Sequence, residues 1–281
     1  ANKDNPMVNE KFVTAHYENE DLFKMIEEGL KTMAVDLDNV KIEDLSPVDE
    51  FHLGGADGTR FVIEELKKVK KGEFVDIGCG LGGPARHISK ILDRKIKGID
   101  LTPSFVRYGN KLSDLVGEKD SVDLIQGSAL DTPFASDTFD AAYMVHVGMN
   151  IDKKVELFEE VKRLLKPESL FVIYDVMAVG TYPIDYPVPW ASNESESAVE
   201  NLENYCKYLE QVGFTVTKSQ LLAEFAKRFI EQTIEKRKIQ GIAPLGLHLL
   251  LGETADIKMR NVFDQVLKGS LAPGLIVAQA P

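Results

Sequence analysis

The stretch FVDIGCGLGGPARHI at 74–88 holds the residues whose spacing points most directly to chemistry. Gly78, Gly80 and Gly83 follow the pattern G-x-G-x-x-G directly after a short apolar run. Glycines at this spacing let the backbone approach a ligand closely where a strand turns into a helix. The pattern fits a pyrophosphate, another adenosine-bearing cofactor, or a plain tight turn.

Two carboxylates separate these alternatives. Asp100 ends the next apolar run, 24 residues after Asp76, where an acidic side chain accepts hydrogen bonds from the ribose of an adenosine. Asp76 stands two residues before Gly78, where its charge would repel a pyrophosphate but attract a cofactor that carries an ammonium and a sulfonium. The two carboxylates therefore favour a positively charged adenosyl cofactor such as S-adenosylmethionine over a pyrophosphate. A strand-end aspartate that caps a turn and a nicotinamide-dependent oxidoreductase remain alternatives.

The elements that must position these residues alternate regularly from residue 74 onward. We expect strands at 74–78, 95–101, 122–127, 139–147 and 169–177, and helices at 84–93, 102–117 and 152–167, the last ended by Pro167. This alternation predicts an α/β fold with a parallel, doubly wound sheet and helices on both faces. Ligands of such sheets bind outside the carboxyl ends of the strands. The stretch GSALDTPF at 127–134 follows the third strand at this edge, where Ser128, Ala129 and Leu130 could meet an adenine.

The two ends of the chain read differently from this core. Before the core we expect helices at 8–45, ended by SPVDE at 46–50, and at 57–69. After the core we expect a helix at 200–213, a strand at 214–222, a helical stretch at 223–270 and a strand at 274–281. We expect the last two strands to pair antiparallel. The helical stretch between them would then form a cap inserted before the seventh strand. We divide the chain into an N-terminal helical lid (1–70), a cofactor-binding core (71–222) with a substrate loop (181–199), and a cap with the final strand (223–281).

Taken together, these motifs resemble the class I S-adenosylmethionine-dependent methyltransferases over most of the chain. VDIGCGLGGPAR is similar to their first motif, GIDLTPSFV to the ribose motif, GSALDTPF to the adenine motif, and TFDAAYMVHV with LLKPESLFVIYDV to the elements that follow. The resemblance implies a Rossmann-like methyltransferase fold and adds Leu101, beside Asp100, to the cofactor contacts. One departure is Glu168-Ser169, which stands where the family usually has a glycine-rich turn.

A narrower resemblance bears on the methyl acceptor. VDEFHLGGADGT (48–59), HVGMNIDKK (146–154), YPVPWA (186–191) and GLHLLLG (246–252) are similar to the branch that contains sarcosine/dimethylglycine N-methyltransferases. That branch makes glycine betaine by methylating small amino acids, so the resemblance implies N-methylation of sarcosine or dimethylglycine. Another nitrogen, oxygen, sulfur or carbon nucleophile of a small metabolite is the alternative, and a non-catalytic cofactor-sensing module is a further one.

Methyl transfer from a sulfonium is an in-line displacement, and an amine acceptor must lose its proton before it attacks. His146 follows the fourth strand, and the unperturbed pKa of a histidine lies near neutrality, so His146 is the candidate general base. The alternatives for His146 are a contact with the substrate or the cofactor, and a purely structural packing role. Because a quaternary ammonium favours aromatic walls, Tyr17, Tyr143 and Trp190 are substrate-binding candidates. The other candidates are His52 as a contact, Asn150 as a hydrogen-bond partner of the substrate or a helix cap, and Met149 as part of the wall. Arg228, Arg237 and Arg260 in the cap are candidate clamps for a carboxylate.

The composition narrows the class of partner. The chain has 33 basic and 45 acidic residues, a formal net charge of −12. Such a surface disfavours nucleic acids and anionic membranes, so we expect a small-molecule partner. Two cysteines, a polar N-terminal stretch and no long apolar run predict a cytoplasmic protein. Five scattered histidines predict no metal site, which leaves a metal-dependent methyltransferase of catechol type as a remote alternative. The sequence indicates no oligomeric state.

Overall fold

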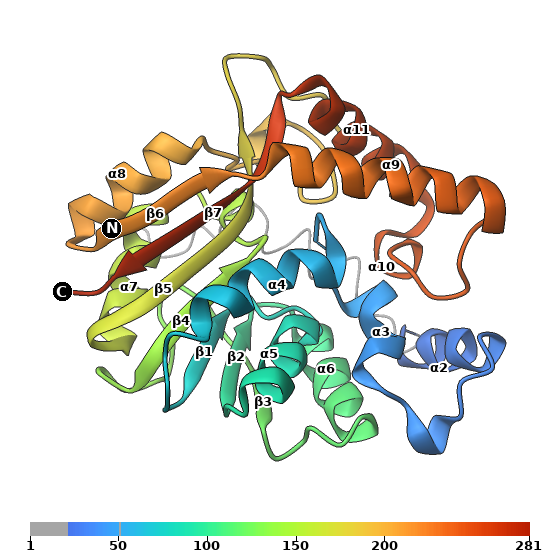
Figure 1. The fold of residues 1–281 in the computed structure, drawn as a ribbon, viewed down its shortest axis with the longest axis horizontal. Coiled ribbons are helices and arrows are strands. Elements are labelled where there is room, and N and C mark those ends of the chain that lie inside the picture. Colours follow the sequence, from blue (N-terminus) through green and yellow to red (C-terminus); the bar gives the residue numbers. More distant parts are fainter. Residues whose placement is uncertain (1–21, 51) are drawn as a thin grey trace.

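A seven-stranded sheet with the order β3-β2-β1-β4-β5-β7-β6 forms the centre of the computed structural model, which describes residues 22–50 and 52–281 (Figure 1). The strands are β1 Phe74–Ile77, β2 Ile96–Asp100, β3 Val122–Gln126, β4 Phe139–Val145, β5 Leu165–Ala178, β6 Thr215–Leu221 and β7 Leu271–Gln279. β1 to β5 pair in parallel, and β7 lies antiparallel between β5 and β6. The predicted sheet, including its antiparallel terminal pair, is confirmed.

The burial of the strands follows from their positions in the sheet. β1 is buried along its whole length, as is typical of a central parallel strand covered on both faces. β6, at the edge, is mostly exposed and carries Lys218, a residue type that discourages edge-to-edge pairing with another chain. Because β1 to β4 run parallel, their carboxyl ends lie at one rim of the sheet.

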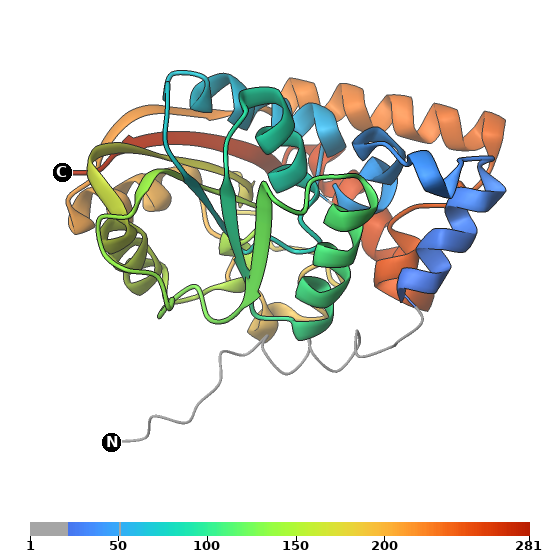
Figure 2. The same ribbon diagram turned by 90° about the horizontal axis from the view of Figure 1, so that it is seen from below.

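Helices cover both faces of the sheet. α4 (Gly55–Leu66), α5 (Gly83–Leu92) and α6 (Pro103–Leu115) contribute to the core on one face, and α7 (Lys154–Leu164) and α8 (Leu202–Val212) to the core on the other. Figure 2 shows α4 and α5 on one side of the strands and α7 on the opposite side. No helix joins β3 to β4: residues 127–138 form a loop at the rim instead.

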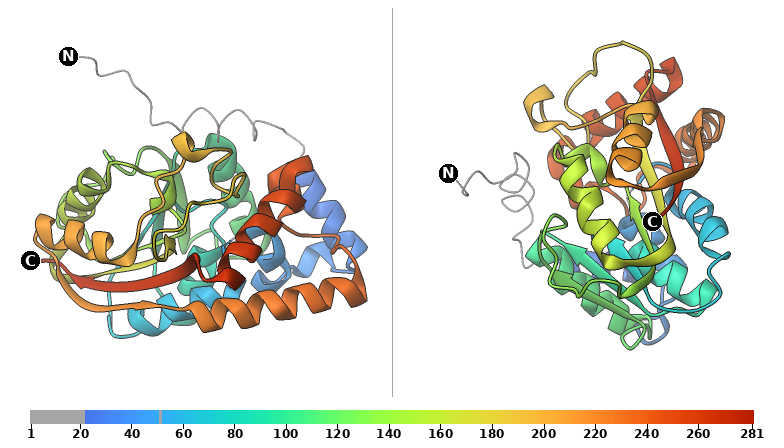
Figure 3. Two further views of the ribbon diagram at one scale, coloured as in Figure 1. Left: turned by 90° about the horizontal axis from the view of Figure 1, so that it is seen from above. Right: turned by 90° about the vertical axis from the view of Figure 1, so that its left-hand side faces the viewer.

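The remaining helices gather beyond the carboxyl ends of the parallel strands. They are α2 (Leu22–Thr32), α3 (Ile42–Asp49), α9 (Ala223–Gln240), α10 (His248–Leu251) and α11 (Ala255–Lys268), with short 3-10 helices at Leu37–Asn39, Gly148–Asn150, Glu194–Glu196 and Gly252–Thr254. Figures 1 and 3 both place α2, α9, α10 and α11 at this end. Ile26 and Leu30 of α2 pack with Leu245 and Leu250 of the cap. None of the helices in the described part of the chain is long and apolar enough to cross a membrane.

Two of the predicted helix ends differ from the structure for an identifiable reason. The predicted helix end at residue 45 is wrong, because α3 continues through Pro47 and ends at Asp49, within the predicted breaker at 46–50, with Ile42, Leu45 and Val48 buried on one face. That burial outweighs the cost of a proline inside a helix. The predicted helix end at Pro167 is also wrong: α7 stops at Leu164, and β5 starts at the next residue.

The early start of β5 has a local cause. Leu165 pairs with Phe139 of β4, which draws the chain into the sheet four residues before the predicted strand at 169–177. Glu168 then takes a left-handed backbone conformation, with φ of 64°, at the position where the sequence departs from a glycine-rich turn. A non-glycine residue is strained in this conformation.

Replacing Glu168 by glycine is expected to stabilise the protein by about 0.5–1 kcal/mol, because the relief of left-handed strain exceeds the entropic cost of glycine. The measurement is the free energy of unfolding from urea titration. The matched control is Glu159→Gly, since Glu159 is exposed within α7, where glycine should cost about 1 kcal/mol. Equal destabilisation by both variants would contradict the assignment of strain to Glu168.

Candidate active site

The glycine-rich loop joins β1 to α5 at the rim. The N–H groups of Gly78 and Cys79 both donate to the carbonyl of Ile99, at 2.8 and 3.0 Å, which fixes the turn against β2. Gly78 has φ of +73°, and a Cβ there would lie 2.4 Å from Val147. A Cβ on Gly83 would lie 2.2 Å from the carbonyl oxygen of Asp49, so this glycine permits close packing on α3. Of the three glycines in the pattern, the structure places Gly78 and Gly80 at the cavity and Gly83 behind it.

Asp100, at the end of β2, is held by two backbone donors. The N–H of Gly80 donates to Oδ2 at 2.8 Å, and the N–H of Thr102 donates to Oδ1 at 2.9 Å. Burial raises the pKa of Asp100, and these hydrogen bonds oppose the shift. Each carboxylate oxygen keeps a second lone pair. The arrangement fits the two hydroxyls of a ribose that lies along the glycine loop.

Asp76, on β1, is a buried carboxyl at the wall of the cavity. Its Oδ2 atom makes no hydrogen bond of ordinary geometry with the described residues. Burial raises the pKa of Asp76 to about 8; the phenol of Tyr143 opposes this shift, and the carboxyls of Asp100 and Glu50 add to it. A buried, unpartnered carboxyl oxygen fits the ammonium of the predicted cofactor.

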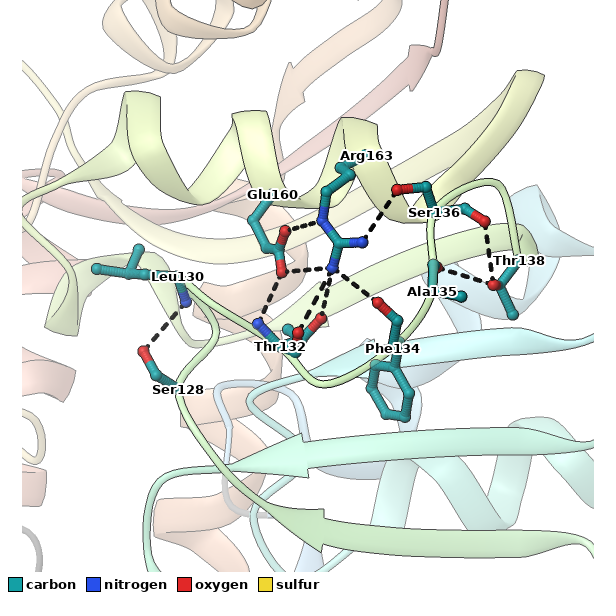
Figure 4. A network of polar contacts seen from close by, with 9 residues as sticks. All are labelled: Ser128, Leu130, Thr132, Phe134, Ala135, Ser136, Thr138, Glu160 and Arg163. Carbon is teal, nitrogen blue, oxygen red and sulfur yellow. Dashed lines mark hydrogen bonds and ion pairs between the residues drawn. The ribbon is translucent and has the colours of Figure 1, made fainter.

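The loop between β3 and β4 is held by one guanidinium (Figure 4). Arg163 of α7 pairs with Glu160 and donates to the carbonyl of Phe134 at 2.9 Å and the hydroxyl of Ser136 at 3.1 Å. Glu160 in turn accepts the N–H of Thr132 at 2.7 Å. These contacts replace the rigidity that a helix would provide at this connection.

The start of the same loop contributes one of its three expected residues to the cavity wall. Gly127 and Ala129 line the cavity, whereas Ser128 and Leu130 do not. The Ser128 hydroxyl accepts the N–H of Leu130 at 3.2 Å and so closes its own turn (Figure 4). The backbone and the small Ala129 side chain are therefore what an adenine would meet.

A cavity of about 450 Å³ continues from this rim to the cap. Its cofactor side is lined by Asp76, Gly78, Gly80, Asp100, Leu101, Thr102, Gly127 and Ala129. Its cap side is lined by His52, Leu53, His146, Met149, Asn150, Val176, Trp190, Phe229, Leu250, Lys258, Met259, Val262 and Phe263. The volume falls within the range of small-molecule sites, and the two sides differ sharply in polarity.

His146 lies where these two sides meet. Its backbone is left-handed, with φ of 54°, and its ring stacks on Tyr174 with centroids 5.4 Å apart. The N–H of Leu53 donates to Nδ1 at 3.4 Å, whereas Nε2 has no partner among the described residues. Burial lowers the pKa of His146 well below its usual value, and His52 lowers it further, so the ring is neutral.

The segment before α4 brings His52 to the same place. The hydroxyl of Thr59 donates to Oε2 of Glu50 at 2.7 Å and lies 2.9 Å from Nε2 of His52. His52 packs edge-on against His146, with ring centroids 5.6 Å apart. The hydroxyl of Tyr174 donates to the carbonyl of Leu53 and anchors this segment to β5. The lid and the sheet therefore build this part of the cavity jointly.

The other predicted substrate residues fall into three groups. Met149, Asn150 and Trp190 line the cavity with His52, and the indole N–H of Trp190 donates to the hydroxyl of Ser197 at 3.0 Å. Tyr143 does not line the cavity; it is fully buried behind it, beside Asp76. Tyr17 lies outside the described residues. The candidate clamps Arg228, Arg237 and Arg260 are absent from the cavity wall, and Arg237 pairs with Asp256 instead.

Sequence reasoning missed Lys258 in this wall. Lys258, Met259, Val262 and Phe263 of α11 all line the cavity. Their spacing of one, four and five residues places them on one face of a helix, and that apolar face was the available signal. Among the described residues, no three histidine, cysteine, aspartate or glutamate side chains are grouped as they would be around a metal ion.

Binding of S-adenosylhomocysteine is expected to release a proton from Asp76. With its pKa at about 8 in the cofactor-free protein, this carboxyl is mostly protonated at pH 7, and a neighbouring ammonium favours the carboxylate. The affinity should therefore rise with pH, by up to about tenfold per unit between pH 6 and 7.5. Calorimetry at pH 6.5 in buffers of different ionisation enthalpy measures the proton count.

The matched variants for this prediction are Asp76→Asn and Asp123→Asn. Asp76→Asn should abolish the proton release, whereas Asp123→Asn should preserve it, because Asp123 is an exposed residue of β3 paired with Lys97. Wild-type binding without proton release would show that no cationic group of the ligand meets Asp76.

The fold relates the chain to a class of proteins. A seven-stranded sheet in this order, with a glycine loop after β1 and a carboxyl group at the end of β2, is the fold of class I methyltransferases. The chain carries such a domain: residues 75–173 match the family model described as "Methyltransferase domain". Solved structures with this fold contain S-adenosylmethionine or S-adenosylhomocysteine, in agreement with the predicted cofactor.

Known proteins resemble the chain to different extents. It is 29% identical over 232 residues to 24-methylenesterol C-methyltransferase 3 of Arabidopsis thaliana, a match that covers 73% of this chain and 65% of that protein. The chain thus spans less than two thirds of this relative.

Solved structures extend the likeness of fold. A geranyl diphosphate methyltransferase in complex with GPP and sinefungin matches 97% of this chain and 99% of its own, with a TM-score of 0.68 and 17% identity. A putative sarcosine dimethylglycine methyltransferase from Galdieria sulphuraria matches 91% of this chain and 98% of its own, with a TM-score of 0.63 and 15% identity. At these identities the likeness concerns the fold.

Proposed function

We propose that the protein transfers the methyl group of S-adenosylmethionine to a small-molecule acceptor with an apolar body. The observation that carries this proposal is the continuous cavity between the carboxylates of Asp76 and Asp100 and an apolar wall supplied by the cap. A cofactor seated on the carboxylates would point its reactive end towards that wall. An apolar acceptor would displace water from the wall, which favours binding and keeps water from the reaction.

The residues between the two sides would position the reacting atoms. Because Nδ1 of His146 accepts the N–H of Leu53, the neutral ring holds its proton at Nε2. From there it can donate a hydrogen bond to a lone pair of the acceptor. This arrangement supports a contact role for His146 over the general-base role. An acceptor that must lose a proton would transfer it to another group or to solvent. In-line attack on the methyl carbon then depends on alignment.

N-methylation of sarcosine or dimethylglycine is the second candidate. The resemblance of the segments at 48–59 and 186–191 supports it, and Trp190 in the cavity wall could face a quaternary ammonium. An acceptor of that size would leave much of the apolar wall in contact with water, so the geometry favours the first candidate. A cytoplasmic location stays a prediction from the cysteine content and the polar N-terminal stretch.

The test is methyl transfer from labelled S-adenosylmethionine to a panel of acceptors. Isoprenoid, alkyl and aromatic amines, phenols and thiols are compared with sarcosine and dimethylglycine. Higher kcat/KM for apolar acceptors is expected, and turnover confined to sarcosine and dimethylglycine would favour the second candidate. Calorimetry should detect binding of S-adenosylhomocysteine; binding of NAD in its place would overturn both.

A further inference from the structure

Lys258 places a basic group on the cap side of the cavity. Four carboxyl groups line the cofactor side and its neighbourhood: Asp49, Glu50, Asp76 and Asp100. Among the described residues that line the cavity, Lys258 is the only lysine or arginine. The cavity is thus acidic where a cationic cofactor would bind and basic in the cap.

Lys258 lies in the wall of the cavity and not on the outer surface of the protein. It is only 9% exposed, on the apolar face of α11 that also presents Met259, Val262 and Phe263. Buried lysines are almost always paired, because an isolated ammonium is costly to remove from water.

The protein itself supplies little compensation for this charge. No hydrogen bond or ion pair of the Lys258 ammonium is found within residues 22–50 and 52–281, and burial lowers its pKa. Glu196 opposes that shift from a distance, but its oxygens already accept the N–H of Ser192 at 2.7 Å and the amide of Asn193 at 3.1 Å. The stabilising partner of Lys258 is therefore to be sought in a ligand.

We infer that Lys258 binds an acidic head group, a carboxylate or a phosphate, of an acceptor whose apolar body lies along the α11 face of the cavity. This inference rests on the proposed function, since it names the substrate class of the same site. The head group at Lys258 would fix the acceptor at one end and leave its nucleophile to be placed beside His146. Specificity would arise because neutral analogues leave the Lys258 ammonium without a partner.

Tryptophan fluorescence provides a direct test, because Trp190 is the only tryptophan of the chain and lines the cavity. The full chain, saturated with S-adenosylhomocysteine, is titrated with decanoate, decyl phosphate and 1-decanol. We expect decanoate or decyl phosphate to bind at least about tenfold more tightly than 1-decanol, and the stronger of the two identifies the head group. Binding of neither anion more tightly than 1-decanol would overturn the inference.

Lys258→Met should weaken binding of the preferred anion by about 10- to 100-fold and leave 1-decanol within about twofold. Lys268→Met is the matched control, because Lys268 is exposed on the same helix and outside the cavity wall. Lys258→Gln serves as a second variant that keeps a polar side chain of similar length. Equal affinity of wild type and both Lys258 variants for the anions would overturn the inference. Because the readout is equilibrium binding, its failure is distinct from an absence of methyl transfer.

Discussion

Asp100→Asn is expected to raise the dissociation constant of S-adenosylhomocysteine by about 100-fold or more. Both carboxylate oxygens are engaged as acceptors, one by the N–H of Gly80 and the other by the N–H of Thr102. An asparagine has a single acceptor oxygen, so its amide N–H₂ must oppose one of these backbone donors. The variant therefore loses a charge-assisted hydrogen bond to the ribose and also displaces the glycine loop.

Calorimetric titration measures this effect, with Asp123→Asn as the control. Asp123 lies on the neighbouring strand β3, is largely exposed and stands outside the cavity wall. Its replacement should change the dissociation constant by less than about twofold, since exposed ion pairs contribute little. If Asp100→Asn bound the ligand within about threefold of wild type, Asp100 would not be the ribose-binding carboxylate.

Arg86→Met is expected to destabilise the protein by about 3–5 kcal/mol, the range for breaking a buried ion pair. The Arg86 guanidinium is fully buried and pairs with Asp49 of α3 at 2.8 Å. It also donates to the carbonyls of Leu81 at 2.6 Å and Gly109 at 3.0 Å. Methionine fills much of the volume but leaves a buried carboxylate and two carbonyls without their donor. Because Leu81 belongs to the glycine loop, cofactor binding should weaken as well.

Urea unfolding measures the loss, and a double variant separates charge from packing. Asp49→Leu in the Arg86→Met background removes the unpaired carboxylate and should recover part of the stability. Arg107→Met is the control, because Arg107 is an exposed residue of α6 whose guanidinium lies 4.9 Å from the centroid of the Tyr108 ring, and its change should stay within about 1 kcal/mol. A loss below about 1 kcal/mol for Arg86→Met would show that this ion pair does not hold the lid to the core.

The sequence by itself determined the parallel core and the cofactor end of the site. The apolar runs, the helices between them and the spacing of Gly78, Gly80, Asp76 and Asp100 are local patterns. Local patterns are sufficient here because consecutive β-α units bring the carboxyl ends of their strands to one rim whatever the details of packing. The confirmed parallel sheet and the residues that line the cofactor side of the cavity follow from this geometry.

Only the tertiary structure decided how the cap side of the cavity is assembled. Leu53 reaches His146 across 93 residues of sequence, and Asp49 reaches Arg86 across 37, so these contacts depend on how the lid docks on the core. Lys258 faces the cavity because of the rotation of α11 about its own axis. The packing of the cap determines this rotation. Such orientations arise from contacts between distant segments, and the sequence pattern of one helix specifies its apolar face without specifying what that face meets.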